Sequence, residues 1–170
     1  GKGEAWFDAV RLIALDEKPS VMIPPCGKAP KIDGVLDDPC WRNVATLAPF
    51  TLNTGEGPPL AGTEARIGYD DENLYIAARM EEPNMRGLVA QVTERDGKVW
   101  RDDCLEIFID PEADQADYWH FAVNAFGIVY DAHDSQGGII EDRGWSCPVR
   151  VGTTREEKAW SLEIAIPLYA

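Results

Sequence analysis

Residues 104–124 read CLEIFIDPEADQADYWHFAVN, two alternating segments joined by a short acidic loop. Leu105, Ile107 and Ile109 recur at every second position, and successive side chains of a strand point to opposite faces of its sheet. We therefore expect two neighbouring strands, each with one apolar face turned to the core. The opposite face would carry Cys104, Glu106 and Phe108 from the first strand and Tyr118, His120, Ala122 and Asn124 from the second.

Short strands separated by turn residues occur on both sides of this stretch, from residue 64 onward. The pattern is typical of a sandwich or a barrel and not of alternating strands and helices. The sequence therefore predicts an all-β fold, with a tight turn at residues 70–72 that makes a hairpin of the first two strands. The expected strands are 64–69, 73–81, 104–110, 118–124, 127–132, 147–153 and 159–167.

One short helix is expected, at Asp38–Thr46. An aspartate at its start can accept the first free backbone N–H groups, and Pro39 stands where its missing N–H costs nothing. Trp41 and Val44 are three residues apart, so we expect both to face the sheet and to pack in the core.

Composition narrows the classes of partner. The chain has 170 residues, 45% of them apolar, which is enough for one substantial core. Sixteen basic and thirty acidic residues give a net charge of −14, which repels nucleic-acid backbones and anionic membrane surfaces. We therefore expect neither nucleic acid nor a membrane as a partner, and no apolar run reaches the roughly 18 residues of a membrane span. Neutral ligands, cations and proteins remain as classes of partner.

The four cysteines allow three pairings if all are bridged; they are Cys26, Cys40, Cys104 and Cys147. The pairing that we expect first is Cys26 with Cys40, since both flank the segment 30–41, and Cys104 with Cys147 is expected second. Four partly buried thiols are the alternative. None of the spacings is the close cysteine pair of a zinc ribbon, so structural zinc is not expected.

A group of polar and aromatic residues is expected around Glu106. Alternation places His120 and Asn124 on the same side of the neighbouring strand, and Arg79 could reach this patch or pair with Glu106. Trp100 lies in the loop just before, where a large ring gains less from core packing. Sugars are held by such groups, because an aromatic ring stacks on the C–H face of a pyranose while charged and amide groups bond its hydroxyls. The alternative is that Trp100 only covers the end of the sandwich and that Glu106 is an ordinary solvated residue of the strand.

Three motifs resemble, in order and spacing, the hallmarks of the family 9 carbohydrate-binding modules. They are KIDGVLDDPCW at 31–41, IGYDDENLYIA at 67–77 and WRDDCLEIFID at 100–110. Three linked motifs are far more specific than any one of them, and the resemblance covers residue 28 to the end. It implies an antiparallel two-sheet β-sandwich of the immunoglobulin-like or DOMON-like kind, a non-catalytic accessory module of extracellular polysaccharide-degrading enzymes. Its implied partners are glucan or xylan, in some members at the reducing end, and neighbouring domains of the same polypeptide.

The resemblance also implies roles for single residues. Trp100 matches one of two tryptophans that sandwich the sugar, Glu106 matches a hydrogen-bonding carboxylate, and Asp103 matches a residue that shapes the loop. Two departures weaken the transfer. Ala122 stands where an arginine contacts sugar in the best-known members, and the second tryptophan would lie beyond Ala170, so the expected site is incomplete.

The two ends of the chain suggest a fragment of a longer protein. Residues 1–15 look like the closing strand of a preceding jelly-roll domain, 16–27 like a linker, and 28–170 like the module with its C-terminal strands missing. An ordinary first strand of the same sandwich is the alternative for residues 1–15. If the protein is exported, as an extracellular or cell-surface glycoside hydrolase would be, its signal lies upstream.

Calcium is a further possibility, since members of the family can bind it. The residues that gather oxygens at a spacing suited to a hard cation are Asp110, Glu112, Asp114 and Asp117. We favour a solvated acidic turn, because the order of an EF-hand loop is absent.

Three other functions compete. A glycosidase pair of Asp103 and Glu106 is disfavoured, because two residues three apart on a strand point to opposite faces while such carboxylates must flank one bond about 5 to 10 Å apart. A structural spacer without sugar binding is supported by Ala122. Haem ligation, as in cytochrome-like relatives of the sandwich, is the third. The residues that could ligate haem are Met22, Met80, Met85, His120 and His133.

Overall fold

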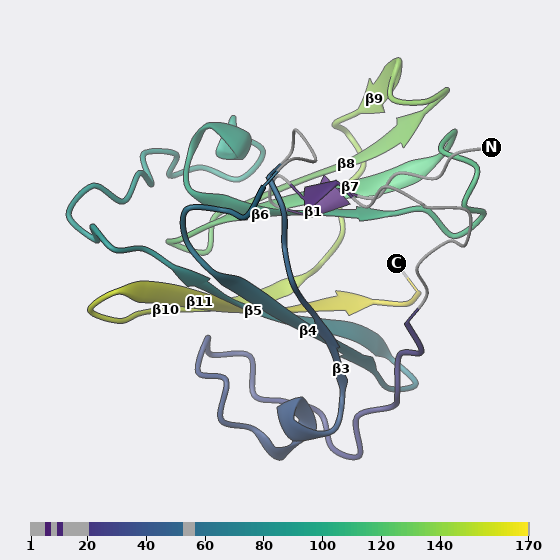
Figure 1. The fold of residues 1–170 in the computed structure, drawn as a ribbon. Helices are drawn as coiled ribbons and strands as arrows, with labels where there is room; N and C mark the ends of the chain where they lie inside the picture. Colours follow the sequence, from purple (N-terminus) through teal and green to yellow (C-terminus); the bar gives the residue numbers. More distant parts are fainter. Residues whose placement is uncertain (1–5, 8–9, 12–20, 53–56, 170) are drawn as a thin grey trace. The chain divides into compact units, whose positions relative to one another are not determined.

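The strands of the chain form two antiparallel sheets, one in each of two compact units (Figure 1). The computed structural model describes residues 6–7, 10–11, 21–52 and 57–169. The first unit is centred on residues 89–146, and the second is built from residues 21–50, 59–88 and 147–169. Within the described residues the only helices are two single 3-10 turns, and none is long and apolar enough to cross a membrane. The predicted all-β fold is confirmed.

The sheet of the first unit has β6 and β7 near its centre, as expected from the alternating segments. Its strands, in spatial order, are β2 (Val10–Arg11), β1 (Trp6–Phe7), β6 (Cys104–Ile109), β7 (Tyr118–Asn124), β8 (Val129–Ser135) and β9 (Ile140–Asp142). Cys104 lies opposite Asn124 and Ile109 lies opposite Trp119, so the acidic loop closes a long hairpin.

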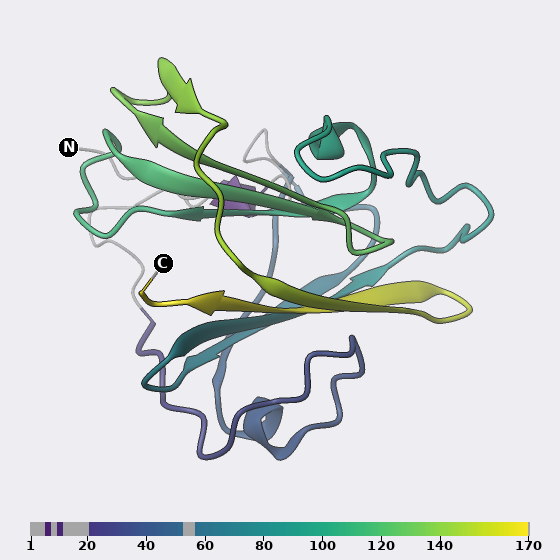
Figure 2. The ribbon, with the colours of Figure 1, turned by 180° about the vertical axis from the view of Figure 1, so that it is seen from behind.

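The sheet of the second unit is built around the predicted hairpin of β4 and β5. Its strands, in spatial order, are β10 (Arg150–Arg155), β11 (Ala159–Pro167), β5 (Asn73–Glu81), β4 (Thr63–Tyr69) and β3 (Ala45–Leu47). Asp70 makes the hairpin turn, since its Oδ1 accepts the backbone N–H groups of Glu72 and Asn73. The segment before β3 lies along one face of this sheet (Figure 2).

The predicted helix at 38–46 is wrong in length and type. Only a single 3-10 turn forms, η1 (Pro39–Arg42), and β3 follows it with Ala45 opposite Ile67. Val44 and Thr46 are β-branched, which disfavours a continued helix and suits an edge strand. The expected packing is confirmed, because Trp41 is buried and Val44 packs against the same apolar cluster.

Glu163 anchors the segment before β3 to the sheet of the second unit. Its carboxylate lies fully buried on β11 and accepts the backbone N–H groups of Asp33 and Gly34 and the indole N–H of Trp41, at 2.9, 2.8 and 2.6 Å. Gly34 has a φ of +84° and passes so close to β10 that a Cβ would lie 2.5 Å from the backbone of Thr153. Only glycine therefore allows this close approach.

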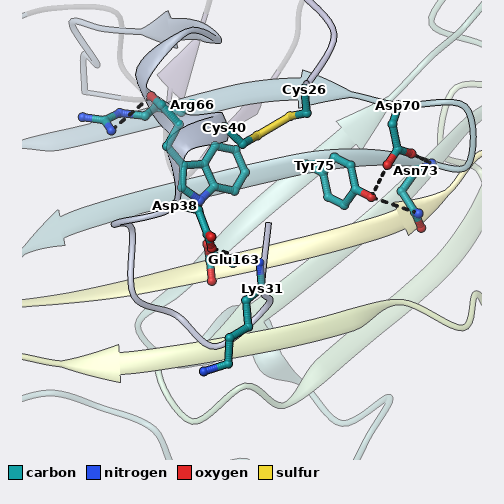
Figure 3. The surroundings of a disulfide bond; sticks show 10 residues. Cys26, Lys31, Asp38, Cys40, Arg66, Asp70, Asn73, Tyr75 and Glu163 are labelled. Atoms are coloured by element: carbon teal, nitrogen blue, oxygen red, sulfur yellow. Dashed lines mark hydrogen bonds between the residues drawn. A yellow bond between two sulfur atoms is a disulfide. The ribbon is translucent and has the colours of Figure 1, made fainter. Parts of the chain in front are cut away.

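The first of the two expected disulfides is present. Cys26 and Cys40 are bonded beside Tyr75, within the buried cluster that also holds Trp41 (Figure 3). Cys104 and Cys147 are both buried, and their expected pairing stays a prediction. Cys104 packs in the apolar cluster of its own unit.

The proposed domain boundaries fall partly outside the described residues. Of residues 1–15 only 6–7 and 10–11 are described, and there Phe7 pairs with Ile107 of β6, as a first strand of the same sheet would. Residues 21–27 of the expected linker belong to the second unit, where the N–H of Cys26 donates to the carbonyl of Tyr69. The assignment of residues 1–15 to a preceding domain stays a prediction.

Replacing Glu163 tests the anchor. Glu163→Ala leaves three buried N–H donors without their acceptor, which we expect to lower the free energy of unfolding by about 3 kcal/mol. Urea denaturation followed by tryptophan fluorescence measures the change. The control is Glu157→Ala at an exposed turn position, which should stay within about 0.5 kcal/mol of wild type. Equal stability of the two variants would show that the buried carboxylate does not hold the segment.

Candidate functional site

One face of the first unit's sheet carries the polar and aromatic side chains that alternation predicts. Glu106 lies opposite Ala122, Phe108 opposite His120, and Tyr130 of β8 on the other side of Ala122. Directly opposite residues of an antiparallel pair share a face. We call this surface the Glu106 face. It consists of Cys104, Glu106, Phe108, Tyr118, His120, Ala122, Asn124, Tyr130, Ala132 and Asp134, with Glu141 from β9.

The other face of β6 and β7 is apolar and closed. Leu105, Ile107, Phe121 and Val123 are at most 1% exposed. The burial of these four side chains confirms the expected orientation of both strands, although Cys104, Ala122 and Asn124 of the opposite face are buried as well. It also fixes the register, because a slip of one residue would turn these four side chains away from the core.

A continuous row of rings crosses the Glu106 face. Tyr118 meets Phe108 edge-on with ring centroids 5.8 Å apart, and Phe108 stacks on His120 at 4.2 Å. His120 meets Tyr130 at 5.2 Å, and Tyr130 meets Trp100 at 4.9 Å. We call these five residues the aromatic strip. Tyr130 is fully buried and the other four are partly exposed, so the strip presents ring surface to solvent from a rigid sheet.

The loop before β6 brings Trp100 to this strip. Trp100 lies in η2 (Val99–Arg101), beside the fully buried Val99. Two aspartates fasten the loop: Asp103 accepts the N–H of Val89 at 2.6 Å, and Asp102 accepts those of Gln91 and Val92 at 3.0 and 2.9 Å. The segment 89–92 is thereby tied to the start of β6, and the loop that carries Trp100 connects them.

Asn124 is a structural residue, which corrects its expected place among the ligand-binding groups. It is fully buried, and its Nδ2 donates to the carbonyl of Val92 and to Asp102. Its Oδ1 accepts the N–H groups of Phe126 and Ile128 in the β7–β8 turn. The donors and the acceptor of this amide are therefore all bonded within the protein, and none is left for a ligand. Alternation gave the correct face, but the loop covers this end of it.

Hydrogen bonding determines the ionisation of Asp102. Burial by itself would raise the pKa of this carboxyl, but the donors Asn124, Gln91 and Val92 together favour the charged form and hold the pKa below its usual range. The loop that carries Trp100 is therefore organised by a carboxylate and not by a neutral acid.

Glu106 and His120 come together as expected. His120 Nε2 lies 2.9 Å from Glu106 Oε2, with side-chain exposures of 14% and 30%. The stacked Phe108 and the edge of Tyr130 fix the imidazole, so it holds the carboxylate in one position. One edge of Glu106 stays open to solvent beside the aromatic strip.

Sequence reasoning missed a second polar group on this face. The hydroxyl of Tyr130 donates to Glu141, and Arg143 Nη2 donates to the same carboxylate at 2.8 Å. The guanidinium carbon of Arg143 lies 5.7 Å from the centre of the Trp100 ring and 6.0 Å from that of Tyr130, within cation–π range. The alternation of β8 could have placed Tyr130, whereas no pattern marks Arg143, which follows a three-residue edge strand.

The ionisable groups around this arrangement influence one another. Burial and the bond to Glu141 raise the pKa of Tyr130, while the bonds from Arg143 and Tyr130 lower the pKa of Glu141. Burial raises the pKa of Asp134, and the neighbouring carboxylate of Glu141 adds to this. Tyr130 therefore stays a neutral hydroxyl donor, and Glu141 a charged acceptor.

Two further expectations concern residues outside this arrangement. Arg79 lies on β5 of the second unit, where its Nη2 donates to Glu156 at 2.8 Å; its expected contact with Glu106 stays a prediction. In the described part of the chain, no three acidic, histidine or cysteine residues gather as a metal site would require. Asp110 of the acidic loop instead accepts the backbone N–H groups of Ala113 and Gln115, and Asp114 accepts that of Ala116. Asp110 and Asp114 thus shape a turn, in line with the solvated acidic turn that was favoured over a calcium site for Asp110, Glu112, Asp114 and Asp117.

Comparison with known proteins identifies the family of the chain. The family model described as carbohydrate family 9 binding domain-like matches residues 32–170. The chain belongs to this family. A family 9 module from Caldicellulosiruptor kristjanssonii, solved with glucose, is similar with a TM-score of 0.58 and 19% identity, covering 87% of this chain and 69% of that one. The same kind of module from that organism, solved with cellotriose, gives 0.57 and 20%, covering 87% and 68%. The family 9 domain therefore has the predicted β-sandwich fold.

Curated relatives of the family 9 domain are much longer proteins. It is 26% identical over 138 residues to exoglucanase XynX of Acetivibrio thermocellus and, over the same length, to endo-1,4-beta-xylanase A of Thermoanaerobacterium saccharolyticum. In both comparisons the match covers 81% of this chain and 11% of the relative. The chain thus spans about a tenth of the length of these proteins.

Acid should weaken the loop that Asp102 organises. The pKa of Asp102 is lower in the folded protein than in the unfolded one, so its bonds add stability above the unfolded pKa of about 3.9, and this is lost as the pH falls through the folded value. We expect Asp102→Asn to be less stable than wild type at about pH 6. The difference in free energy of unfolding should be smaller at about pH 3. Urea denaturation at both pH values measures it.

The matched control for this experiment is Asp71→Asn at an exposed turn position. Its difference from wild type should be similar at the two pH values. A difference for Asp102→Asn that does not narrow in acid would contradict the role of the charged carboxylate.

Proposed function

We propose that this domain is a non-catalytic carbohydrate-binding module that holds a neutral glucan or xylan chain, or an oligosaccharide of one, against the Glu106 face. The observation that carries the proposal is the partly exposed aromatic strip with the carboxylates of Glu106 and Glu141 on the same face. A flat ring can stack on the C–H face of a pyranose, and carboxylates accept bonds from its hydroxyls.

The relatives support this choice of ligand. Two similar family 9 modules were solved with glucose and with cellotriose, both neutral. The charge on the face suits such a ligand, because Glu106, Asp134 and Glu141 would repel an anionic sugar. The strip also runs over several rings from Tyr118 to Trp100, which suits more than one sugar unit.

A binding role is also better supported than catalysis. A glycosidase needs two carboxyl groups that flank one bond. The carboxylate of Asp103 is bonded to the backbone of Val89, and that of Glu106 to His120, so each has a positioning contact. We infer that hydrolysis belongs to other domains of the parent protein, since the curated relatives are named as an exoglucanase and xylanases.

We further propose that the domain works outside the cell as an accessory module of a multidomain glycoside hydrolase. The Cys26–Cys40 disulfide supports this setting, because disulfides persist in oxidising compartments. The length of the relatives supports the presence of further domains in the same polypeptide.

Removing the exposed end of the aromatic strip tests the binding function. Titration calorimetry of the full chain with cellotriose and xylo-oligosaccharides should show binding, and Trp100→Ala should weaken it about tenfold or more, equal to ~1.4 kcal/mol. The control is Tyr169→Ala, which removes an exposed ring of the second unit and should leave the affinity unchanged. An absence of heat with any of these sugars would instead favour a structural spacer.

A further inference from the structure

We propose that Arg143 is the hydrogen-bond donor of the binding face and thereby determines which sugars it accepts. This inference rests on the proposed carbohydrate-binding function and deepens it. Arg143 follows β9, and its guanidinium lies over the rings of Trp100 and Tyr130. It is therefore placed at the end of the aromatic strip where a stacked sugar would lie.

Tyr118, which carries a hydroxyl, lies at the far end of the aromatic strip from Trp100. Nearer to Trp100, the other polar side chains of the face are acceptors or are already engaged as donors. The carboxylates of Glu106 and Glu141 can only accept. The hydroxyl of Tyr130 donates to Glu141, and the Nε2 of His120 is engaged by Glu106. Ala122, at the centre of the face, is fully buried and has no polar side-chain atom. Each sugar hydroxyl can both donate and accept, so without Arg143 the part of the face around Trp100 would offer a sugar mainly acceptors.

Arg143 can supply donors because its guanidinium is held in place while several of its N–H groups are not bonded to Glu141. It carries five N–H groups, of which Nη2 donates to Glu141. Its side chain is 51% exposed. The bond to Glu141 and the two rings beneath the guanidinium reduce the freedom that a long side chain loses on binding.

The pairing with Glu141 gives the site a particular pattern of donor and acceptor. A hydroxyl that donates to Glu141 and a neighbouring hydroxyl that accepts from Arg143 would bind side by side, next to a ring that stacks on Trp100. This pattern selects a neutral sugar with adjacent equatorial hydroxyls, as in glucose and xylose units. A carboxylate-bearing sugar would meet the charges of Glu106, Asp134 and Glu141 as well as that of Arg143.

Replacing the guanidinium tests this role, with cellotriose as the probe in titration calorimetry of the full chain. We expect Arg143→Gln to weaken binding at least about tenfold. Arg143→Lys keeps the charge but loses the planar fork, so it should lie between this variant and wild type. The control Arg86→Gln removes one exposed positive charge in the second unit and should bind as wild type does. Thermal unfolding verifies that each variant is folded.

The outcomes separate this inference from the proposed function. If wild type binds cellotriose and Arg143→Gln binds equally or more tightly, Arg143 only covers the ring, and this inference is overturned while the binding function stands. If wild type binds no sugar, the proposed function fails and the inference falls with it. If Arg143→Lys binds cellotriose as tightly as wild type does, a positive charge alone suffices, and the assignment of a directional donor is wrong.

Discussion

The hydrogen bond from Asn124 to Asp102 joins the end of β7 to the loop that carries Trp100, and the candidate site depends on it. Asn124 also closes the β7–β8 turn, and Asp102 also holds the segment 89–92. Both partners use their side-chain oxygens on backbone N–H groups that would otherwise lack an acceptor. Without this pair the sheet could still form, but the loop would lose the contact that positions the Trp100 ring against Tyr130.

In the second unit too, a buried polar side chain accepts the backbone N–H groups of an irregular segment. There the buried carboxylate of Glu163 takes up the backbone N–H groups of Asp33 and Gly34 together with the indole of Trp41. In each unit a buried polar side chain on a strand satisfies an irregular segment and positions a tryptophan. Trp41 is thereby fully packed and serves stability, whereas Trp100 keeps part of its ring exposed. The difference lies in what covers the ring, a disulfide-linked apolar cluster for Trp41 and the guanidinium of Arg143 for Trp100.

The balance of charge on the Glu106 face explains why one arginine matters. The chain has a net charge of −14, and three carboxylates stand on this face. Such a surface repels anions and offers acceptors in excess. A cation that is bonded to Glu141 and lies within cation–π range of two rings supplies donors beside Trp100 without adding net positive charge to the pair. The face therefore fits a neutral polyhydroxyl ligand by hydrogen-bond complementarity and by stacking.

The sequence by itself determined the strands and their faces, because alternation with a period of two leaves only one register that buries Leu105, Ile107, Phe121 and Val123. It also indicated Trp100 and Glu106 as site residues, and the first disulfide. It could not tell a solvated end of the face from a covered one, so Asn124 was expected to bind a ligand. It could not assign strands to sheets, so it did not reveal that Arg79 on β5 pairs with Glu156. Only the tertiary structure decided these points and revealed Arg143, because contacts between a loop, a sheet and an edge hairpin depend on chain segments far apart in sequence, which no local pattern encodes.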